Sequence, residues 1–180
     1  EGFGGVFIEP LGGLPDVAPH LNRLSEEGVF FTNCYANSFR TDRGTVCTLS
    51  GYLGLPTASV MKIPVKSRML PALSEEMLKA GYATDFLYGG DINFTNMKSY
   101  LLSKGYQKLT ADTDFSLAER TSNVWGVNDD ITADWLLKQL KERTGEGRWF
   151  TTYLTLGSHE PFDVPYIRLE EKIPNAFAYT

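Results

Sequence analysis

The feature that most constrains the fold is an alternation between short β-rich runs and longer stretches with helical periodicity. Three runs predict strands, at residues 29–36 (VFFTNCYA), 83–90 (ATDFLYGG) and 148–156 (RWFTTYLTL). Patterns typical of helices separate these runs. Strands connected through helices pair in parallel, because the chain must cross over the sheet to begin the next strand. The sequence therefore predicts an α/β sandwich, with a mostly parallel sheet flanked by helices.

Several of the intervening segments have clear helical patterns. The clearest covers residues 128–145 (NDDITADWLLKQLKERTG), with acidic residues in the first turn, basic residues late and Gly145 as the stop. Residues 70–81 predict an amphipathic helix that ends at a glycine. Residues 45–53 are apolar enough to predict a buried helix that begins just after a polar turn.

The charge pattern excludes one class of partner. Lys and Arg together number 17 against 22 Asp and Glu, which leaves a formal net charge of −5. No basic run or basic helix face could follow a phosphate backbone, so nucleic acid is not expected as a partner. The sequence also has no apolar stretch of the ~18–20 residues that a membrane-spanning helix needs. The chain opens directly at EGFGG and closes at PNAFAYT, which has neither a cap nor a polar tail. We therefore interpret the chain as a piece of a longer protein.

Polar turns follow the predicted strands, where sites gather in open α/β sheets. Thr41 comes a short loop after the first run, residues 89–96 (GGDINFTN) follow the second, and residues 157–162 (GSHEPF) follow the third. Glu1 would stand at the end of a further strand, if upstream residues form one. Because the carboxyl ends of parallel strands share one edge, these four polar segments predict one site.

Each of these segments also has an ordinary structural explanation. The Thr-Asp-Arg-Gly turn at residues 41–44 can be a capping turn, since Thr and Asp side chains accept hydrogen bonds from free helix N–H groups. His159 can be a surface residue, and residues 89–96 can be a simple turn rich in Gly, Asn and Asp. Residue types and spacing alone therefore predict an α/β domain with a candidate site and leave its chemistry open.

The order of the motifs resembles the sulfatase-like branch of the alkaline phosphatase superfamily. Residues 18–56 resemble its opening helix and strand (APHLNRLSEEGVFFTNCYANSFRTDRGTVCTLSGYLGLP). In true sulfatases a Cys-x-Pro-Ser-Arg loop follows that strand, and counting back from Ser50-Gly51 in the same way leads to Thr41. The sequence has no such loop, which disfavours a formylglycine sulfatase. Thr41 is instead similar to the nucleophile of lipoteichoic acid synthases and phosphoethanolamine transferases, which form a phosphothreonine intermediate.

Four further segments resemble motifs of the synthase group: its first metal loop, its substrate loop, its Trp-Gly-x-x-Asp segment and its Ser-Asn-His-x-Pro-Phe turn. They are residues 1–5 (EGFGG), 93–96 (NFTN), 125–130 (WGVNDD) and 157–162 (GSHEPF). The resemblance implies that Glu1 and Thr41 bind one divalent metal. Mn²⁺ is the first expectation, with Mg²⁺, Ca²⁺ or Zn²⁺ as alternatives.

The resemblance also implies roles for other polar side chains. His159 would bind the phosphate or help the leaving alkoxide depart, while Asn96 occupies roughly the place of a substrate-binding arginine. Asn93 is a further substrate-binding candidate in the same loop. Arg43 and Arg40 are candidates for phosphate contacts, because a guanidinium group matches two phosphate oxygens.

The function that the resemblance implies is metal-dependent phosphoryl-group transfer of the phosphoglycerol transferase type. Thr41 would attack a phosphodiester, such as a phospholipid head group or an envelope polymer, and the phosphoryl group would pass to an alcohol or to water. Two alternatives stay open: a sulfuric ester or phosphodiester hydrolase of the sulfatase family, and a non-catalytic module that binds anionic envelope polymers.

The resemblance also implies where the chain belongs in a larger protein. The family's downstream Asp-His metal ligands do not occur in these 180 residues. We therefore expect residues 1–180 to form the N-terminal portion of a sulfatase-like catalytic domain, whose isolated activity is low. Proteins of this group lie at the extracytoplasmic face of the cell membrane, and attachment would come from segments outside this chain.

Overall fold

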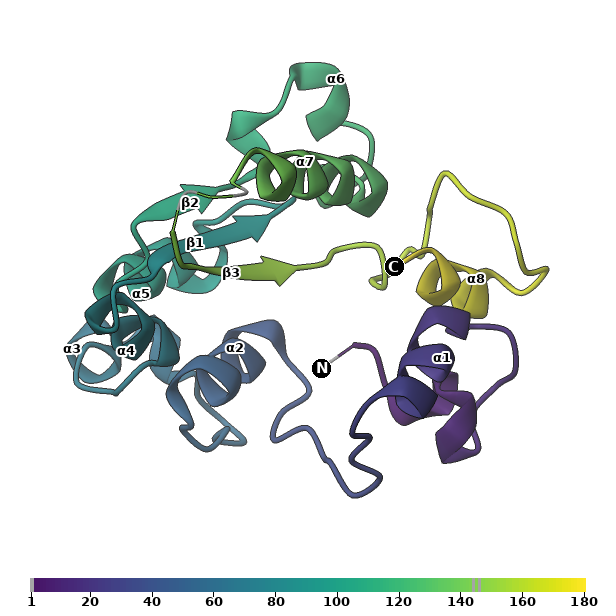
Figure 1. Cartoon of the computed structure of the whole chain (residues 1–180), viewed down its shortest axis with the longest axis horizontal. Coiled ribbons are helices and arrows are strands. Elements are labelled where there is room, and N and C mark those ends of the chain that lie inside the picture. Colours follow the sequence, from purple (N-terminus) through teal and green to yellow (C-terminus); the bar gives the residue numbers. More distant parts are fainter. Residues whose placement is uncertain (1, 144, 146) are drawn as a thin grey trace. The chain divides into compact units, whose positions relative to one another are not determined.

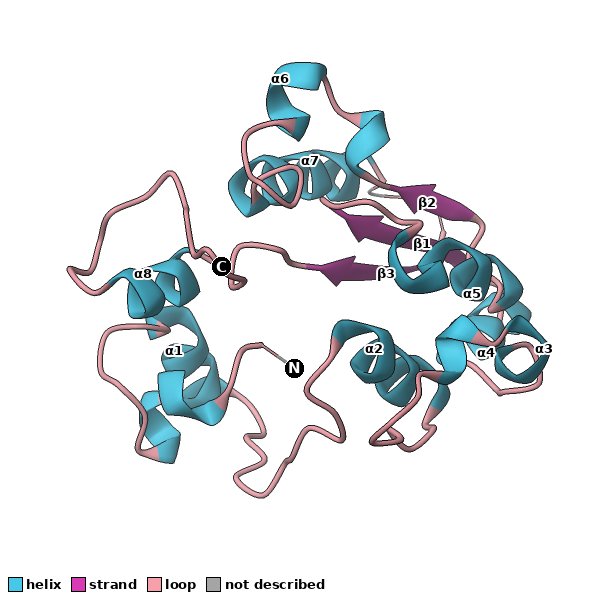
Figure 2. Cartoon of the chain, turned by 180° about the vertical axis from the view of Figure 1, so that it is seen from behind, coloured by secondary structure: helices cyan, strands magenta, loops and turns pink. Residues whose placement is uncertain are grey.

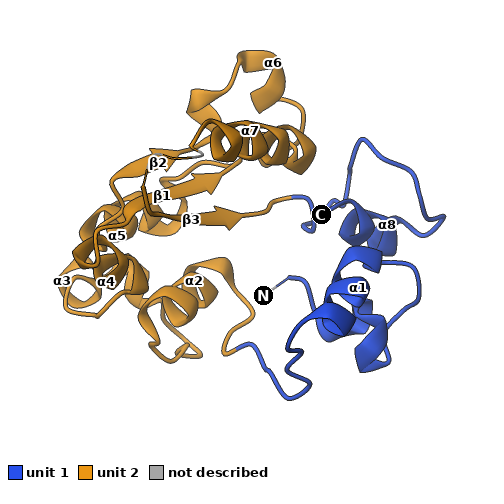
Figure 3. Ribbon diagram, in the orientation of Figure 1, with its two compact units in different colours: residues 1–36, 157–180 blue, residues 37–156 orange. Residues whose placement is uncertain are grey.

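The computed structural model describes residues 2–143, 145 and 147–180 (Figure 1, Figure 2). The chain divides into two compact units, which Figure 3 shows in different colours. Unit 1 combines Glu1–Ala36 with Gly157–Thr180, and unit 2 is the continuous segment Asn37–Leu156.

Unit 2 is built on a three-stranded sheet with the order β2-β1-β3. The central strand β1 (Ala83–Tyr88) pairs in parallel with β2 (Lys108–Thr110) on one side and with β3 (Trp149–Leu154) on the other. In this register Phe86 lies opposite Leu109 and Thr152. The predicted parallel α/β architecture is confirmed, and two of its three strands correspond to runs predicted from the sequence.

One face of the sheet is covered by α7 (Asp129–Glu142), the helix with the clearest sequence pattern. The Thr132 hydroxyl on α7 shares a hydrogen bond of 2.7 Å with the phenol of Tyr153 on β3. Near the end of the same helix, Arg143 pairs with Asp85 on β1 at 2.8 Å. Asp85 and Tyr153 therefore point to the α7 face, as alternation along strands requires.

The opposite face of the sheet carries the main apolar core of unit 2. Phe86 on β1 packs there with side chains from α2 (Thr41–Ser50) and α5 (Met97–Ser103). Because helices cover both faces, the neighbouring residues Phe86 and Leu87 are both buried although they point in opposite directions. The buried members of this core are Val46, Leu49, Val60, Met61, Phe86, Ile92, Met97, Tyr100, Leu101, Tyr106 and Ala111.

Short helices connect the larger elements of unit 2. They are η3 (Val60–Lys62), α3 (Pro64–Ser67), α4 (Leu73–Lys79), η4 (Phe94–Asn96), η5 (Asp112–Asp114) and α6 (Leu117–Arg120). Within the described part of the chain, no helix has the length and apolar character that a membrane crossing requires.

The predicted bounds of the helix after the polar turn are wrong. The helix was expected over residues 45–53, whereas α2 begins at Thr41 and ends at Ser50. Arg40 has an extended backbone (φ −136°) and serves as the N-cap, so the whole polar turn becomes the first turn of the helix. Gly51 ends the helix in the left-handed conformation (φ 62°), which glycine adopts without steric cost.

The strand predicted at residues 29–36 is also wrong, because this segment has no regular structure. Its large side chains are exposed, with Phe31 at 74% and Tyr35 at 84%. A strand forms only where a neighbour satisfies its N–H and C=O groups. Among the described residues, no strand pairs with this segment.

Unit 1 joins two segments that are far apart in the sequence. Its helices are η1 (Gly5–Phe7), η2 (Glu9–Leu11), α1 (Pro19–Glu27) and α8 (Lys172–Tyr179). The rings of Phe7 and Phe177 stack with centroids 3.9 Å apart, and Val17 completes their buried cluster. This aromatic core holds the first segment of the chain against the last.

Candidate functional site

Thr41 is the first residue of the ten-residue helix α2, and it is half-buried. The carbonyl of Arg40 just before it accepts hydrogen bonds from the N–H groups of Arg43 (3.1 Å) and Gly44 (2.8 Å). The N–H groups of a first helical turn point along the helix axis and carry a partial positive charge. The Thr41 position is therefore one at which a negatively charged group is stabilised.

A pocket of about 360 Å³ opens beside this turn, entirely within unit 2. Three cationic side chains and one carboxylate line it, so the pocket is locally positive although the whole chain has a formal charge of −5. Its lining comes from the start of α2 and from the segment that contains η3: Phe39, Arg40, Asp42, Arg43, Pro56, Thr57, Ala58, Ser59, Lys62 and Ile63.

Asp42 connects the two walls of this pocket. Its side chain is only 6% exposed, and its carboxylate lies 3.5 Å from the Lys62 ammonium. The Ser59 hydroxyl donates a hydrogen bond of 3.4 Å to the main-chain carbonyl of Asp42. These two contacts hold the segment around η3 against the first turn of α2.

Arg40 and Arg43, which were both predicted to contact phosphate, line the pocket. The guanidinium carbon of Arg43 lies 5.6 Å from the centre of the Phe39 ring, a cation–π distance. The Nε atom of Arg43 is buried and has no hydrogen-bond acceptor among the described residues. Buried donors normally have an acceptor, so this nitrogen has an unused capacity for a hydrogen bond.

Of the predicted residues in the substrate loop, Asn96 is tied to the pocket segment and Asn93 is not. The Asn96 side chain donates a hydrogen bond of 3.0 Å to the main-chain carbonyl of Met61, the residue directly before Lys62. Asn93 donates from both its main-chain and side-chain nitrogens to the Asp91 carboxylate, at 2.8 and 3.0 Å. Asn93 therefore stabilises its own exposed turn and does not line the pocket.

The segment at residues 125–130, which resembles a family motif, joins the carboxyl ends of two strands. The Val127 N–H donates to the carbonyl of Gly89, which follows β1, at 2.9 Å. The Asp129 carboxylate accepts a hydrogen bond of 2.7 Å from the N–H of Leu156, which follows β3. In this structure the motif shapes the edge of the sheet where the site was expected.

The other predicted catalytic residue, His159, belongs to unit 1, whereas Thr41 belongs to unit 2. The His159 carbonyl accepts a hydrogen bond from the Phe162 N–H at 2.7 Å, within the turn predicted from the sequence. Nearby in unit 1, a Cβ atom on Gly2 would lie 3.3 Å from the Ser158 hydroxyl. The residue after Glu1 therefore lies beside the residue before His159.

The predicted metal site is only partly within the described residues. Glu1, one of its two predicted ligands, lies outside them, and Thr41 is described. The described residues contain no group of three or more His, Cys, Asp and Glu side chains that could hold a metal ion. The described residues therefore do not form a metal cage by themselves.

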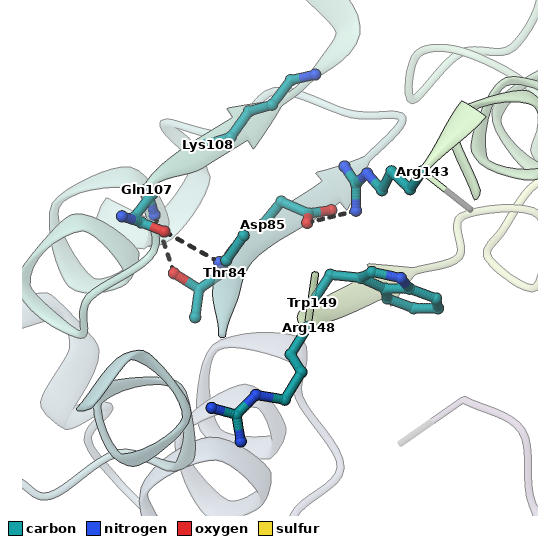
Figure 4. A pocket seen from close by; sticks show the side chains of 8 residues that line it. Thr84, Asp85, Gln107, Lys108, Arg143, Arg148 and Trp149 are labelled. Atoms are coloured by element: carbon teal, nitrogen blue, oxygen red, sulfur yellow. Dashed lines mark hydrogen bonds and ion pairs between the residues drawn. The ribbon is translucent and has the colours of Figure 1, made fainter. Parts of the chain in front are cut away.

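A second pocket, of about 190 Å³, lies at the opposite, amino ends of the strands (Figure 4). The carboxylate of Asp85 pairs with Arg143 at 2.8 Å and accepts a hydrogen bond from Thr151 at 2.9 Å. Two other cations stack on rings, Lys108 on Trp135 and Arg148 on Tyr82. Because its charges have partners within the protein, we interpret this pocket as structural.

Lys62 and Ser59 are pocket residues that sequence reasoning missed. Neither belongs to a periodic pattern or to a segment that resembles a family motif. The sequence showed only that Lys62 is a lysine in a loop, and most protein surfaces have such lysines. Their place in the pocket depends on how η3 packs against α2, which the local sequence does not specify.

The parallel sheet with helices on both faces is an α/β fold that the chain shares with a solved structure of the alkaline phosphatase superfamily. A sequence model of one family, described as Sulfatase, matches residues 1–177, so the chain belongs to the sulfatase family. The predicted membership of the sulfatase-like branch is thereby confirmed.

Two of the solved structures that are similar to this chain cover more than nine-tenths of it. One is a protein in the alkaline phosphatase superfamily from Vibrio parahaemolyticus, with a TM-score of 0.88 and 27% identity, covering 99% of this chain and 45% of that one. The other is the lipoteichoic acid synthase LtaP from Listeria monocytogenes, with a TM-score of 0.80 and 16% identity. That match covers 91% of this chain and 43% of the synthase chain. The chain thus spans less than half the length of either structure.

Proposed function

We propose that the protein transfers phosphoryl groups, in a reaction of the phosphoglycerol transferase type, with Thr41 as its nucleophile. The observation that carries this proposal is the location of Thr41 at the N-terminus of α2, beside a pocket with three cationic side chains. Membership of the sulfatase family and structural similarity to a lipoteichoic acid synthase support phosphoryl or sulfuryl transfer at the level of the superfamily.

Phosphoryl transfer to a threonine requires an activated hydroxyl group and positive charge around the phosphate. The Thr41 oxygen would form a bond to phosphorus while the bond from phosphorus to the leaving alkoxide breaks. The Thr41 hydroxyl would give its proton to water as its oxygen bonds to phosphorus, and the leaving alkoxide would take a proton from His159. Arg40 and Arg43 would neutralise charge on the phosphoryl oxygens.

A second displacement would then regenerate the enzyme. The oxygen of an acceptor alcohol or of water would attack the phosphothreonine, and the Thr41 oxygen would leave and regain a proton. We propose a phospholipid head group or an anionic envelope polymer as the substrate and the extracytoplasmic face of the membrane as the location. Mn²⁺ remains the expected metal, and the assay below is therefore run with and without it.

Mass spectrometry of the full-length protein after incubation with phosphatidylglycerol tests this proposal. We expect a glycerophosphoryl adduct on Thr41 that is absent from Thr41→Ala and persists in Thr45→Ala. Thr45 is a matched control because it lies one turn further along α2 and is also half-buried. An adduct on another residue, or none in either the presence or the absence of Mn²⁺, would contradict Thr41 as the nucleophile. Release of sulfate from an aryl sulfate without any adduct would favour the hydrolase instead.

A further inference from the structure

Lys62 is the pocket residue to which no sequence motif assigned a role. We propose that Lys62, together with Arg40 and Arg43, forms an anion subsite that binds the phosphate group of a phosphomonoester or phosphodiester, with Asp42 holding Lys62 in position. This inference rests on the proposed function for its place in the reaction. The subsite itself is argued from the pocket alone.

The ion pair between Lys62 and Asp42 is asymmetric. The Asp42 side chain is 6% exposed, whereas that of Lys62 is 56% exposed, and the two charged groups are 3.5 Å apart. A buried carboxylate that loses its cation is left uncompensated, so Asp42 keeps the Lys62 ammonium beside the pocket. The exposed part of Lys62 stays open to water and therefore to an incoming anion.

The hydrogen-bonding chemistry of the side chains that line the pocket also points to an anion. The buried Nε of Arg43 has no acceptor among the described residues. Arg40, Arg43 and Lys62 have only donors and no acceptors, so together they suit a ligand rich in acceptor oxygens. A phosphate group has such oxygens and carries the charge that three cations and one carboxylate leave unbalanced.

The segment that carries Lys62 is held in place from two sides. The Ser59 hydroxyl bonds to the Asp42 carbonyl on one side, and the Asn96 amide bonds to the Met61 carbonyl on the other. Met61 itself is completely buried in the core. A ligand would therefore meet a pocket wall whose backbone is already fixed, which reduces the entropy lost on binding.

The test measures the binding of inorganic phosphate by calorimetry to the protein with Thr41→Ala, which removes the proposed nucleophile. We expect Lys62→Gln to weaken binding about tenfold, as the loss of one charge-assisted contact would. Lys62→Arg should retain most of the affinity, because it keeps the charge and the donors. Lys66→Gln is the control, since Lys66 is exposed, lies in the same unit and does not line the pocket.

Equal weakening by Lys62→Gln and Lys66→Gln would overturn the subsite, because it would show only the effect of net charge. Unchanged binding in Lys62→Gln would overturn it as well. Competition by vesicles identifies the source of the phosphate: displacement by phosphatidylglycerol but not phosphatidylcholine indicates a lipid head group, and displacement by neither indicates a soluble phosphate ester. Phosphate binding that depends on Lys62, without an adduct on wild-type Thr41, would refute the proposed function and leave the subsite standing.

Discussion

The side-chain amide of Asn96 donates a hydrogen bond of 3.0 Å to the main-chain carbonyl of Met61. This contact joins η4, the segment that resembles the family's substrate loop, to the completely buried Met61, which precedes Lys62 in η3. Asn96 also has a left-handed backbone (φ 69°), a conformation that asparagine tolerates better than most residues. In this structure Asn96 supports the pocket wall, and a role in binding substrate stays a prediction.

Two substitutions of Asn96 separate its hydrogen bond from its backbone conformation. Asn96→Gly should lower the free energy of unfolding by about 1 kcal/mol, since it removes the bond to Met61 and keeps the left-handed backbone accessible. Asn96→Ala should cost about 2 kcal/mol, because alanine adds strain at φ 69°. Urea denaturation followed by circular dichroism measures both. Equal losses in the two variants would show that the backbone conformation does not matter here.

A buried lysine that does not line the pocket makes a stronger contribution to stability. The Lys104 side chain is 0% exposed, and its ammonium donates to the carbonyls of Arg68 (3.0 Å) and Leu70 (2.6 Å) and lies 3.6 Å from the Glu75 carboxylate. We expect Lys104→Met to lower the free energy of unfolding by about 3 kcal/mol, because two carbonyls and a partly buried carboxylate lose their partner. Chemical denaturation provides the measurement, with the exposed Lys98→Met on helix α5, which ends just before Lys104, as control. Similar losses for the two lysines would contradict this assignment.

Gly126 determines how the segment at residues 125–130 packs on the turn after β1. Its φ is 141°, and a Cβ atom there would lie 2.2 Å from the Gly89 carbonyl oxygen. Gly126→Ala should therefore lower the free energy of unfolding by about 3 kcal/mol or more, since the two backbones would have to separate. Gly51→Ala is the control, because Gly51 (φ 62°) has open space around its Cβ position. It should cost only about 1 kcal/mol of backbone strain, and a thermal melt that ranked Gly51→Ala as the more harmful change would refute the prediction.

The sequence was sufficient to predict β1, β3 and α7, because the residues that favour each of these elements lie within the element itself. The strands combine β-branched and aromatic residues, and the helix has both an apolar face and a charge pattern that suits its dipole. The strand β2 was missed because Lys108–Thr110 is too short to show a period. Residues 29–36 have a strand-like composition, but strand formation also requires a pairing partner elsewhere in the chain, which composition does not reveal.

The candidate site shows the same division between local and tertiary information. Thr41, Arg40 and Arg43 were found because they are close together in the sequence and resemble a family motif. The structure places them on one turn, yet it also shows that Asp42, which was predicted only as a capping residue, is the buried residue that holds the turn to Lys62. Asn93 was predicted to bind substrate because it lies in the loop that resembles the family's substrate loop. Its contacts with Asp91 depend on the shape of that loop, which the sequence does not reveal.

Tyr100 makes the stability of unit 2 dependent on pH in the alkaline range. Its ring is 1% exposed in the main core, and its hydroxyl shares a hydrogen bond of 2.6 Å with Ser50 at the end of α2. Burial raises the pKa of Tyr100 to about 12, although the Ser50 contact opposes the shift. An unfolded tyrosine has a pKa of about 10, so the folded state disfavours the phenolate. This contribution to stability is therefore fully present below about pH 10 and is lost as the pH rises through about 12.

Urea denaturation at a series of pH values, with phenolate absorbance recorded in parallel, measures this loss. Two pH units correspond to at most about 2.7 kcal/mol, so the free energy of unfolding should fall by up to that amount between about pH 10 and 12. In Tyr100→Phe we expect a protein less stable by about 1 kcal/mol at pH 8, because the bond to Ser50 is lost, but a smaller fall at high pH. Burial also raises the pKa of Tyr106 in the same core, which explains why part of the fall should remain. If Tyr100→Phe lost stability as steeply as the wild type over this range, the titrating group would have to be another residue.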